Sequence, residues 1–157
     1  MIVSLKDLRG IRKKHKNQKI VYTSGAFDLL HAGHIKFLKD VREMAQILVV
    51  GITPDKRVRQ KKGDSRPIHT EKTRVIIMDA IKYVNYVFID MESTSTLKNE
   101  KLTLAVLTLL KPDIFVSINP NWLNYKKKLT GLGVKLTILP VKKIDSTTDI
   151  INRVASN

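Results

Sequence analysis

The chain has 157 residues, enough for one ordinary domain, and its hydrophobic fraction of 43% excludes disorder over its whole length. It contains no cysteine, which excludes disulfides, iron–sulfur clusters, thiol nucleophiles and cysteine-based zinc sites. Its 29 Lys and Arg residues against 14 Asp and Glu residues give a net charge of +15. An excess of this size predicts an anionic partner: nucleic acid, a membrane surface or a phosphorylated small molecule.

Neither a signal peptide nor a membrane span is expected from the sequence. The first segment, MIVSLKDLRGIRKKHK, is polar from residue 6 onward and lacks the apolar run of a signal peptide. The longest apolar stretches, residues 45–52 and 105–110, are too short to cross a bilayer. A cytoplasmic protein without a membrane partner is therefore expected.

Along the chain, two kinds of segment alternate. Nearly continuous apolar runs rich in Val, Ile and Phe predict buried strands at residues 19–23, 47–53, 83–89, 113–118 and 134–139. Helical spacing of apolar residues predicts helices at residues 31–44, 70–81 and 94–110, and a last helix at residues 146–154 with Ser146 as its N-cap. The alternation predicts one α/β domain over residues 1–157. We expect a Rossmann-like, doubly wound, parallel five-stranded sheet with helices on both faces.

In such a sheet, ligands bind beyond the carboxyl ends of the strands, and the turn after the first strand has the residues for a phosphate site. His31 and His34 lie three positions apart at the start of a helix, so they share one face. Gly25 and Gly33 allow a ligand close to the backbone, and the helix start favours phosphate. A metal site is disfavoured, because His15 and His69 are the only other histidines. Two ordinary surface histidines are the remaining alternative.

Residues 25–34, GAFDLLHAGH, resemble the G-x-F-D-x-x-H-x-G-H signature of the cytidylyltransferase-like nucleotidyltransferases. Five further segments resemble motifs of this family, and the resemblance extends from about residue 19 to residue 153: residues 50–55 (VGITPD), 61–68 (KKGDSRPI), 83–87 (YVNYV), 111–116 (KPDIFV) and 146–151 (STTDII). Within the family, the R-P-I loop and the S-T-T-x-I-I segment are most similar to the heptose-1-phosphate adenylyltransferase domain of lipopolysaccharide core biosynthesis. Glycerol-3-phosphate cytidylyltransferase is the nearest other relative.

The resemblance implies an enzyme that joins a nucleoside triphosphate to a phosphorylated small-molecule acceptor and releases pyrophosphate. An adenylyl group is favoured, with a sugar phosphate or polyol phosphate as acceptor and Mg²⁺ carried by the triphosphate rather than by a protein metal site. His31, His34 and Lys62 would be the catalytic residues. The residues implied in nucleotide binding are Gly25, Ala26, Phe27, Gly33, Arg66, Arg74, Asn119, Asn121, Trp122, Ser146, Thr147 and Thr148.

Two departures from the family pattern bear on the nucleotide. Relatives carry a Gly-Asp pair after the fourth strand, where this chain has SINPNW at residues 117–122, so contacts with the base or ribose differ. Cytidylyltransferases of this type have an Arg shortly before S-T-T that is absent here, which favours ATP over CTP. Trp122 would stack on a base or pack in the core, and Ser146 would cap its helix with or without a ligand.

Other functions stay open as alternatives. A cytidylyltransferase of the glycerol-3-phosphate type is one, and a non-catalytic, basic nucleotide- or nucleic-acid-binding protein on the same fold is another. The basic run at residues 57–66 would cover a triphosphate or bind nucleic acid. Nucleic acid is disfavoured, because aromatic residues make up only 6% and do not interleave with the basic runs. Relatives are often dimers, so a homodimer is one option, and the sequence alone does not determine the oligomeric state.

Overall fold

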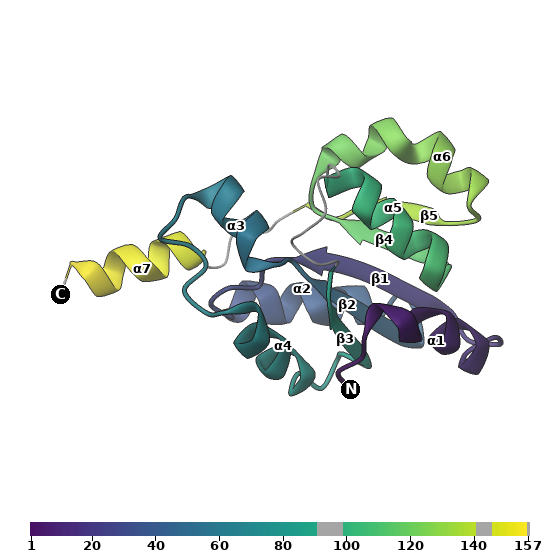
Figure 1. Cartoon of the computed structure of the whole chain (residues 1–157), viewed down its shortest axis with the longest axis horizontal. Coiled ribbons are helices and arrows are strands. Elements are labelled where there is room, and N and C mark those ends of the chain that lie inside the picture. The colour runs from purple at the N-terminus through teal and green to yellow at the C-terminus, as the bar shows by residue number, and fades with distance from the viewer. Residues whose placement is uncertain (91–98, 141–145, 157) are drawn as a thin grey trace.

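The computed structural model describes residues 1–90, 99–140 and 146–156, and these form a parallel five-stranded sheet with helices on both faces (Figure 1). The strand order is β3-β2-β1-β4-β5, so the chain winds outward in one direction from β1, returns, and continues in the other. The five strands are β1 (Ile20–Gly25), β2 (Ile47–Ile52), β3 (Tyr86–Ile89), β4 (Ile114–Ser117) and β5 (Lys135–Ile138). The predicted fold class is confirmed, and each strand begins and ends within two residues of its predicted bounds except β3, which begins three residues later than predicted.

Seven α-helices and two short 3-10 helices connect or flank these strands in the described chain. The helices are α1 (Leu8–Lys14), α2 (Ala32–Arg42), α3 (Asp55–Lys62), α4 (Glu71–Asp79), α5 (Asn99–Leu110), α6 (Lys126–Gly131) and α7 (Thr147–Ala155), and the 3-10 helices are η1 (Leu5–Asp7) and η2 (Pro120–Tyr125). Helices α2, α4, α5 and α7 confirm predicted helices, although residues 94–98 of the third one lie outside the described residues. In the described ranges, no helix is both long and apolar enough to cross a membrane.

The sheet separates two apolar cores. One core joins α1, α5 and α6 to the face that carries Ile20 and Tyr22 of β1. The other core joins α2 and α4 to the opposite face, which carries Val21 of β1. Because successive side chains of a strand point to opposite faces, even-numbered residues of β1 belong to the first core and odd-numbered residues to the second.

Tyr22 lies at the centre of the first core. Its ring stacks on Phe88 of β3, with centroids 6.1 Å apart, and on Phe115 of β4, with centroids 5.7 Å apart. The three rings come from three different strands on one face, so they fix the sheet against α5. Aromatic pairs of this kind stabilise a fold by about 0.5–1.5 kcal/mol beyond the area that they bury.

Three helices, α1, α3 and α6, were not predicted. All three are rich in Lys or Arg, and each buries at most two residues: Leu8 and Ile11 in α1, Arg57 and Val58 in α3, and Leu129 in α6. Such segments show too little apolar periodicity to be told from polar loops. The position of α3 matters for function, because it begins three residues after β2 and so lies at the carboxyl edge of the sheet (Figure 1).

Candidate functional site

Two histidines lie together at the start of α2. His31 is the N-cap residue and His34 follows one turn later, and their rings stack with centroids 3.9 Å apart and planes 26° apart. The Nδ1 atom of each ring is buried, and no hydrogen-bond partner for it exists among the described residues. Buried polar atoms are nearly always paired in folded proteins, so two such atoms side by side indicate a place where a ligand completes the bonding.

Phe27 supports the second histidine. Its ring meets the His34 ring edge-on, with centroids 5.4 Å apart, and its backbone has a φ of 46°, a region that bulky residues rarely adopt. A Cβ atom at Gly25 would lie only 2.9 Å from the Phe27 ring. Gly25 therefore leaves space for the ring that positions His34. Sequence reasoning assigned both residues to nucleotide contact, and the structure gives them this positioning role.

Asp28 connects the histidine turn to the basic loop. Its carboxylate accepts hydrogen bonds from the backbone N–H groups of Ile68 at 2.8 Å and His69 at 3.0 Å, and from Nε of Arg66 at 2.7 Å. Burial raises the pKa of Asp28, but the two backbone donors and Arg66 outweigh it, so the pKa lies below the ordinary value. Asp28 was not among the predicted site residues, although the D of the G-x-F-D signature is a signal that could have found it.

Arg66 was predicted to bind nucleotide, and the structure gives its side chain a structural partner first. The guanidinium is buried against Asp28, while its Nη2 atom is buried with no partner among the described residues. One donor thus holds the loop and another remains available to an anion. Arginine suits this double role because its fork offers five N–H donors.

Lys62, at the end of α3, belongs to the same cluster. Partial burial of its ammonium group, followed by the nearby charge of Arg66, lowers the pKa of Lys62. The Lys62 charge in turn acts on His34, together with those of His31 and Asp28. The structure therefore brings together the three residues predicted to be catalytic: His31, His34 and Lys62.

His34 is uncharged at neutral pH. Burial, the neighbouring His31 and Lys62 lower the pKa of His34 from 6.5 to about 4, although the nearby backbone of Leu29 opposes the shift. A neutral imidazole donates a hydrogen bond through one nitrogen. The ring can therefore bind a phosphate oxygen without first being protonated.

The lowered pKa of His34 predicts a pH dependence of stability. The unfolded chain takes up a proton near pH 6.5 and the folded chain only near pH 4, so acidification through this interval favours unfolding. We expect the free energy of unfolding to fall as pH drops from about 6.5 to about 4, and to fall less in His34→Asn. Urea unfolding of both proteins at half-unit pH steps measures the difference, and parallel curves for the two proteins would contradict the shift.

Arg74 was also predicted to contact nucleotide, but each of its three guanidinium nitrogens already donates to an acceptor of the protein. It donates to the carbonyl oxygen of Ala26 at 2.5 Å, to Oδ1 of Asp55 at 2.6 Å and to the carbonyl oxygen of His69 at 3.0 Å. Its side chain is completely buried. Arg74 therefore clamps the turn after β1 to the starts of α3 and α4, and the Ala26 carbonyl belongs to this clamp.

The remaining predicted residues follow β4 or begin α7. Asn119 and Asn121 are exposed at the carboxyl end of β4, where the Asn119 side chain accepts from the backbone N–H of Asn121 at 3.0 Å. Trp122 is 9% exposed, and its ring packs edge-on against Phe115, with centroids 4.9 Å apart. Trp122 therefore packs in the core, and its contact with a base stays a prediction.

The last predicted group begins α7. Ser146 caps α7 by accepting from the backbone N–H of Asp149 at 3.1 Å, which confirms the predicted N-cap. Thr147 is buried and Thr148 is exposed. Helix α7 extends away from the sheet (Figure 1).

The donors of this site suit an anion better than a cation. Across the described residues, no group of three or more His, Asp and Glu side chains could hold a metal ion. The two carboxylates of the site, Asp28 and Asp55, already accept from Arg66 and Arg74. Magnesium held by the oxygens of a bound triphosphate fits such a site, and it stays a prediction.

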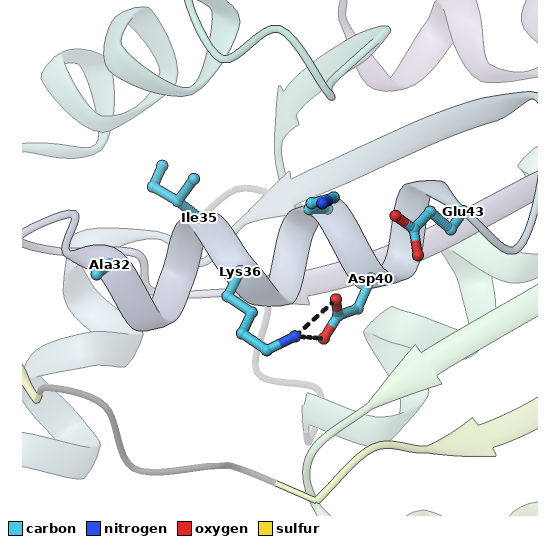
Figure 2. Close-up of a pocket in the computed structure, with 6 residues that line it drawn as sticks. Ala32, Ile35, Lys36, Asp40 and Glu43 are labelled. Carbon is cyan, nitrogen blue, oxygen red and sulfur yellow. Dashed lines mark hydrogen bonds and ion pairs between the residues drawn. The ribbon is translucent and has the colours of Figure 1, made fainter.

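A groove of about 810 Å³ runs along one side of α2 (Figure 2). It is lined by Ala32, Ile35, Lys36, Lys39, Asp40 and Glu43. Lys36 and Asp40 form an ion pair of 2.8 Å on its wall. None of the predicted site residues lines this groove, so it is separate from the histidine cluster.

Comparison with known proteins agrees with the geometry. The sequence profile of the cytidylyltransferase-like family matches residues 22–153 of the chain. The chain therefore belongs to the cytidylyltransferase-like family, as the sequence motifs predicted, and it is a nucleotidyltransferase domain.

Curated relatives carry the name bifunctional protein HldE. The one from Campylobacter concisus is 34% identical over 154 residues, covering 96% of this chain and 30% of that protein. The one from Syntrophotalea carbinolica is 32% identical over 154 residues, again covering 96% of this chain and 30% of the relative. The chain thus spans about a third of the length of these relatives.

Among solved structures, a lipopolysaccharide core biosynthesis protein from Thermoplasma volcanium is similar, with a TM-score of 0.64 and 25% identity, covering 82% of this chain and 99% of that one. A pantoate-beta-alanine ligase from Francisella tularensis has a TM-score of 0.62 at 18% identity, covering 100% of this chain and 78% of that one. The second likeness is one of fold alone.

Proposed function

We propose that the protein transfers a nucleotidyl group, preferentially adenylyl, from a nucleoside triphosphate to a sugar phosphate or polyol phosphate and releases pyrophosphate. The observation that carries the proposal is the stacked pair His31–His34, each with a buried nitrogen lacking a partner, beside the ammonium group of Lys62. These groups form a cluster of donors at a helix start, where phosphate is favoured.

The reaction needs no nucleophile from the protein. An oxygen of the acceptor phosphate attacks the α-phosphorus in line, the bond to the bridging oxygen breaks, and pyrophosphate leaves with that oxygen. Negative charge grows on the phosphate oxygens as the reaction proceeds, so catalysis consists of positioning and charge stabilisation. His31 and His34 would donate to the α- and β-phosphate oxygens, Lys62 would supply a positive charge, and the start of α7 would hold the β/γ end.

The preference for ATP rests on sequence departures near both ends of the site. The Arg that precedes S-T-T in cytidylyltransferases of this type is absent here, and the Gly-Asp pair after β4 is replaced. One similar structure is that of a lipopolysaccharide core biosynthesis protein, and this likeness also favours an acceptor of the kind used in that synthesis. Mg²⁺ on the triphosphate, a homodimer and a cytoplasmic location remain predictions, and nucleic acid is not an expected partner.

A nucleotide panel tests the donor. We expect ATP with Mg²⁺ to raise the unfolding temperature and CTP, GTP and UTP to raise it less. A ligand at one hundred times its Kd stabilises a folded protein by about 2.7 kcal/mol. Pyrophosphate release with ATP and a set of sugar and polyol phosphates then tests the transfer itself.

The outcome for CTP and for nucleic acid separates the alternatives. A shift with CTP alone would replace the adenylyl proposal by a cytidylyl one. No shift with any nucleotide, together with salt-sensitive binding of DNA or RNA, would point to a non-catalytic basic protein.

A further inference from the structure

The positive charge of the chain is concentrated in one part of the molecule. Among the described residues, 1–19 and 99–140 contain 13 Lys and Arg residues against 3 Asp and Glu residues, a net charge of +10. They comprise β4, β5 and the helices α1, α5 and α6, which cover one face of the sheet. Residues 20–90 and 146–156, which include the histidine cluster, contain 13 against 9, a net charge of +4. Most of the excess therefore lies away from the groups proposed to bind phosphate.

Six exposed lysines of this part gather at the amino ends of the strands, and Figure 1 shows the end of α1 at the opposite end of β1 from α3. Helix α1 ends at this edge, because Nε2 of His15 lies 2.8 Å from the hydroxyl of Tyr86, the first residue of β3. The turn between α5 and β4 lies there too, because Oδ2 of Asp113 accepts from the backbone N–H of Ile20, the first residue of β1, at 2.8 Å. We call these lysines the amino-edge patch: Lys13, Lys14, Lys16, Lys19, Lys111 and Lys135.

Carboxylates of the protein leave the charge of the amino-edge patch uncompensated. Asp113 lies among the lysines, but its Oδ2 already accepts from Nη1 of Arg12 at 2.9 Å. Glu43, the C-cap of α2, lies at the same edge on the opposite face of the sheet. None of the six ammonium groups forms an ion pair with a carboxylate. The six charges therefore remain available to an external anion.

Stabilisation of helix ends explains only half of the amino-edge patch. A cation at the C-terminal end of a helix is favourable, which accounts for the two lysines that end α1 and for Lys111, which directly follows α5. Lys16, Lys19 and Lys135 lie outside the helices, so no helix end needs their charges. Like charges gathered on one edge repel one another and destabilise the folded state. Their common position therefore indicates an anionic partner at this edge.

The composition of the amino-edge patch fits an anionic bilayer better than nucleic acid. All six cations are lysines, point charges that attract a diffuse negative surface, whereas directed recognition of phosphates and bases uses the arginine fork. The patch holds no aromatic side chain on which a base could stack. Leu132, 38% exposed, lies in the turn between α6 and Lys135. An apolar side chain beside lysines strengthens binding at the boundary between headgroups and acyl chains, but contributes little on a phosphate backbone.

We propose that the amino-edge patch binds the anionic headgroups of a phospholipid bilayer, with Leu132 entering the boundary region. Contact at this edge leaves the histidine cluster facing water on the other side of the sheet, about 20 Å away, which is the length of the six-residue strand β1. Small phosphorylated substrates therefore reach the site while the protein is bound. The expectation of no membrane partner is replaced, because it rested on the absence of an apolar span, and binding at a bilayer surface needs none.

Sedimentation with lipid vesicles tests the partner independently of catalysis. We expect the protein to bind vesicles of phosphatidylcholine that contain about 30% phosphatidylglycerol, and not to bind vesicles of phosphatidylcholine alone. Binding should weaken by about tenfold or more when the salt concentration rises from about 0.1 M to about 0.5 M, because salt screens exposed charges. No binding to either kind of vesicle, or equal binding to both, would overturn the proposal.

The combined variant Lys16→Gln, Lys19→Gln and Lys135→Gln removes the three charges that no helix end needs. A lysine near an anionic bilayer strengthens binding by about fivefold, so we expect a loss of about a hundredfold with an unchanged unfolding temperature. The matched control removes three exposed charges from the helices of the opposite layer: Lys36→Gln, Lys39→Gln and Lys72→Gln. We expect the control to lose less than about threefold. Equal losses in the two variants would make net charge, rather than this patch, responsible and would overturn the proposal.

Leu132→Ser separates a bilayer from nucleic acid as the partner. We expect it to weaken binding to the anionic vesicles by about threefold or more, because it removes the apolar contact. Leu123→Ser is the matched control, since Leu123 is 55% exposed in η2, which follows the carboxyl end of β4, and vesicle binding should not change. Fluorescence anisotropy with a DNA duplex and a single-stranded RNA at the same salt concentration measures the competing affinities. Unchanged vesicle binding in Leu132→Ser, or patch-dependent binding of either nucleic acid that is tighter than binding to the vesicles, would overturn the proposal.

Discussion

Alanine in place of His34 is expected to lower kcat for nucleotidyl transfer by about 10²–10³-fold, the effect of removing one donor to a developing charge. The reason is that its hydrogen bond strengthens as charge moves toward the leaving pyrophosphate, so it stabilises the transition state more than the bound nucleotide. The Kd for ATP should change by only a few-fold. Pyrophosphate release at saturating substrates measures the first quantity and calorimetry the second.

The control for this variant is His69→Ala. His69 is bound to the site through its backbone, which donates to Asp28 and accepts from Arg74, so removing its ring should leave kcat nearly unchanged. If His34→Ala instead lost binding and turnover to the same degree, the ring would bind the ground state and the transition state equally.

Replacing Arg74 by methionine is expected to lower the free energy of unfolding by about 3 kcal/mol or more. The substitution keeps most of the volume but leaves Asp55 and two backbone carbonyl groups without the donors that pair them. Arg74→Lys should restore little, because a single ammonium group cannot reach three acceptors that the planar fork reaches. Urea unfolding measures both values.

Arg9→Met is the matched control, because Arg9 is exposed on α1. We expect it to change the free energy of unfolding by less than about 0.5 kcal/mol. If Arg74→Met left the free energy of unfolding unchanged but greatly weakened ATP binding, Arg74 would be a phosphate ligand, as the sequence predicted.

The sequence predicts those strands and helices in which the pattern of apolar residues shows which positions are buried. Strand β2 is apolar throughout except for Gly51, and β1 is apolar over its first three residues, because helices cover both faces of the sheet; that pattern is visible in the residues alone. Helix α3 escaped prediction because it buries only Arg57 and Val58, so its basic residues resemble a loop. Local pattern therefore predicts the core well and the basic rim of the sheet poorly.

The site residues likewise fall into two groups: those that the sequence predicts and those that only the fold explains. The spacing of His31 and His34 is local, and a single helical turn is enough to bring the rings together. The partners of the arginines are distant in sequence: Asp28 lies 38 residues from Arg66, and Asp55 lies 19 residues from Arg74. A sequence shows that a charged residue is present, but only the fold shows that an internal carboxylate already neutralises it.

The alternation of side chains along β1 has a consequence for how relatives of this protein could diverge. Tyr22 belongs to the core under α5, whereas Val21 belongs to the core under α2, the helix that carries His34. Substitutions that reshape the first layer need not disturb the second, since the backbone of one strand insulates them from each other. Related proteins could thus differ in the small molecule that they bind and still keep the same arrangement of His31 and His34.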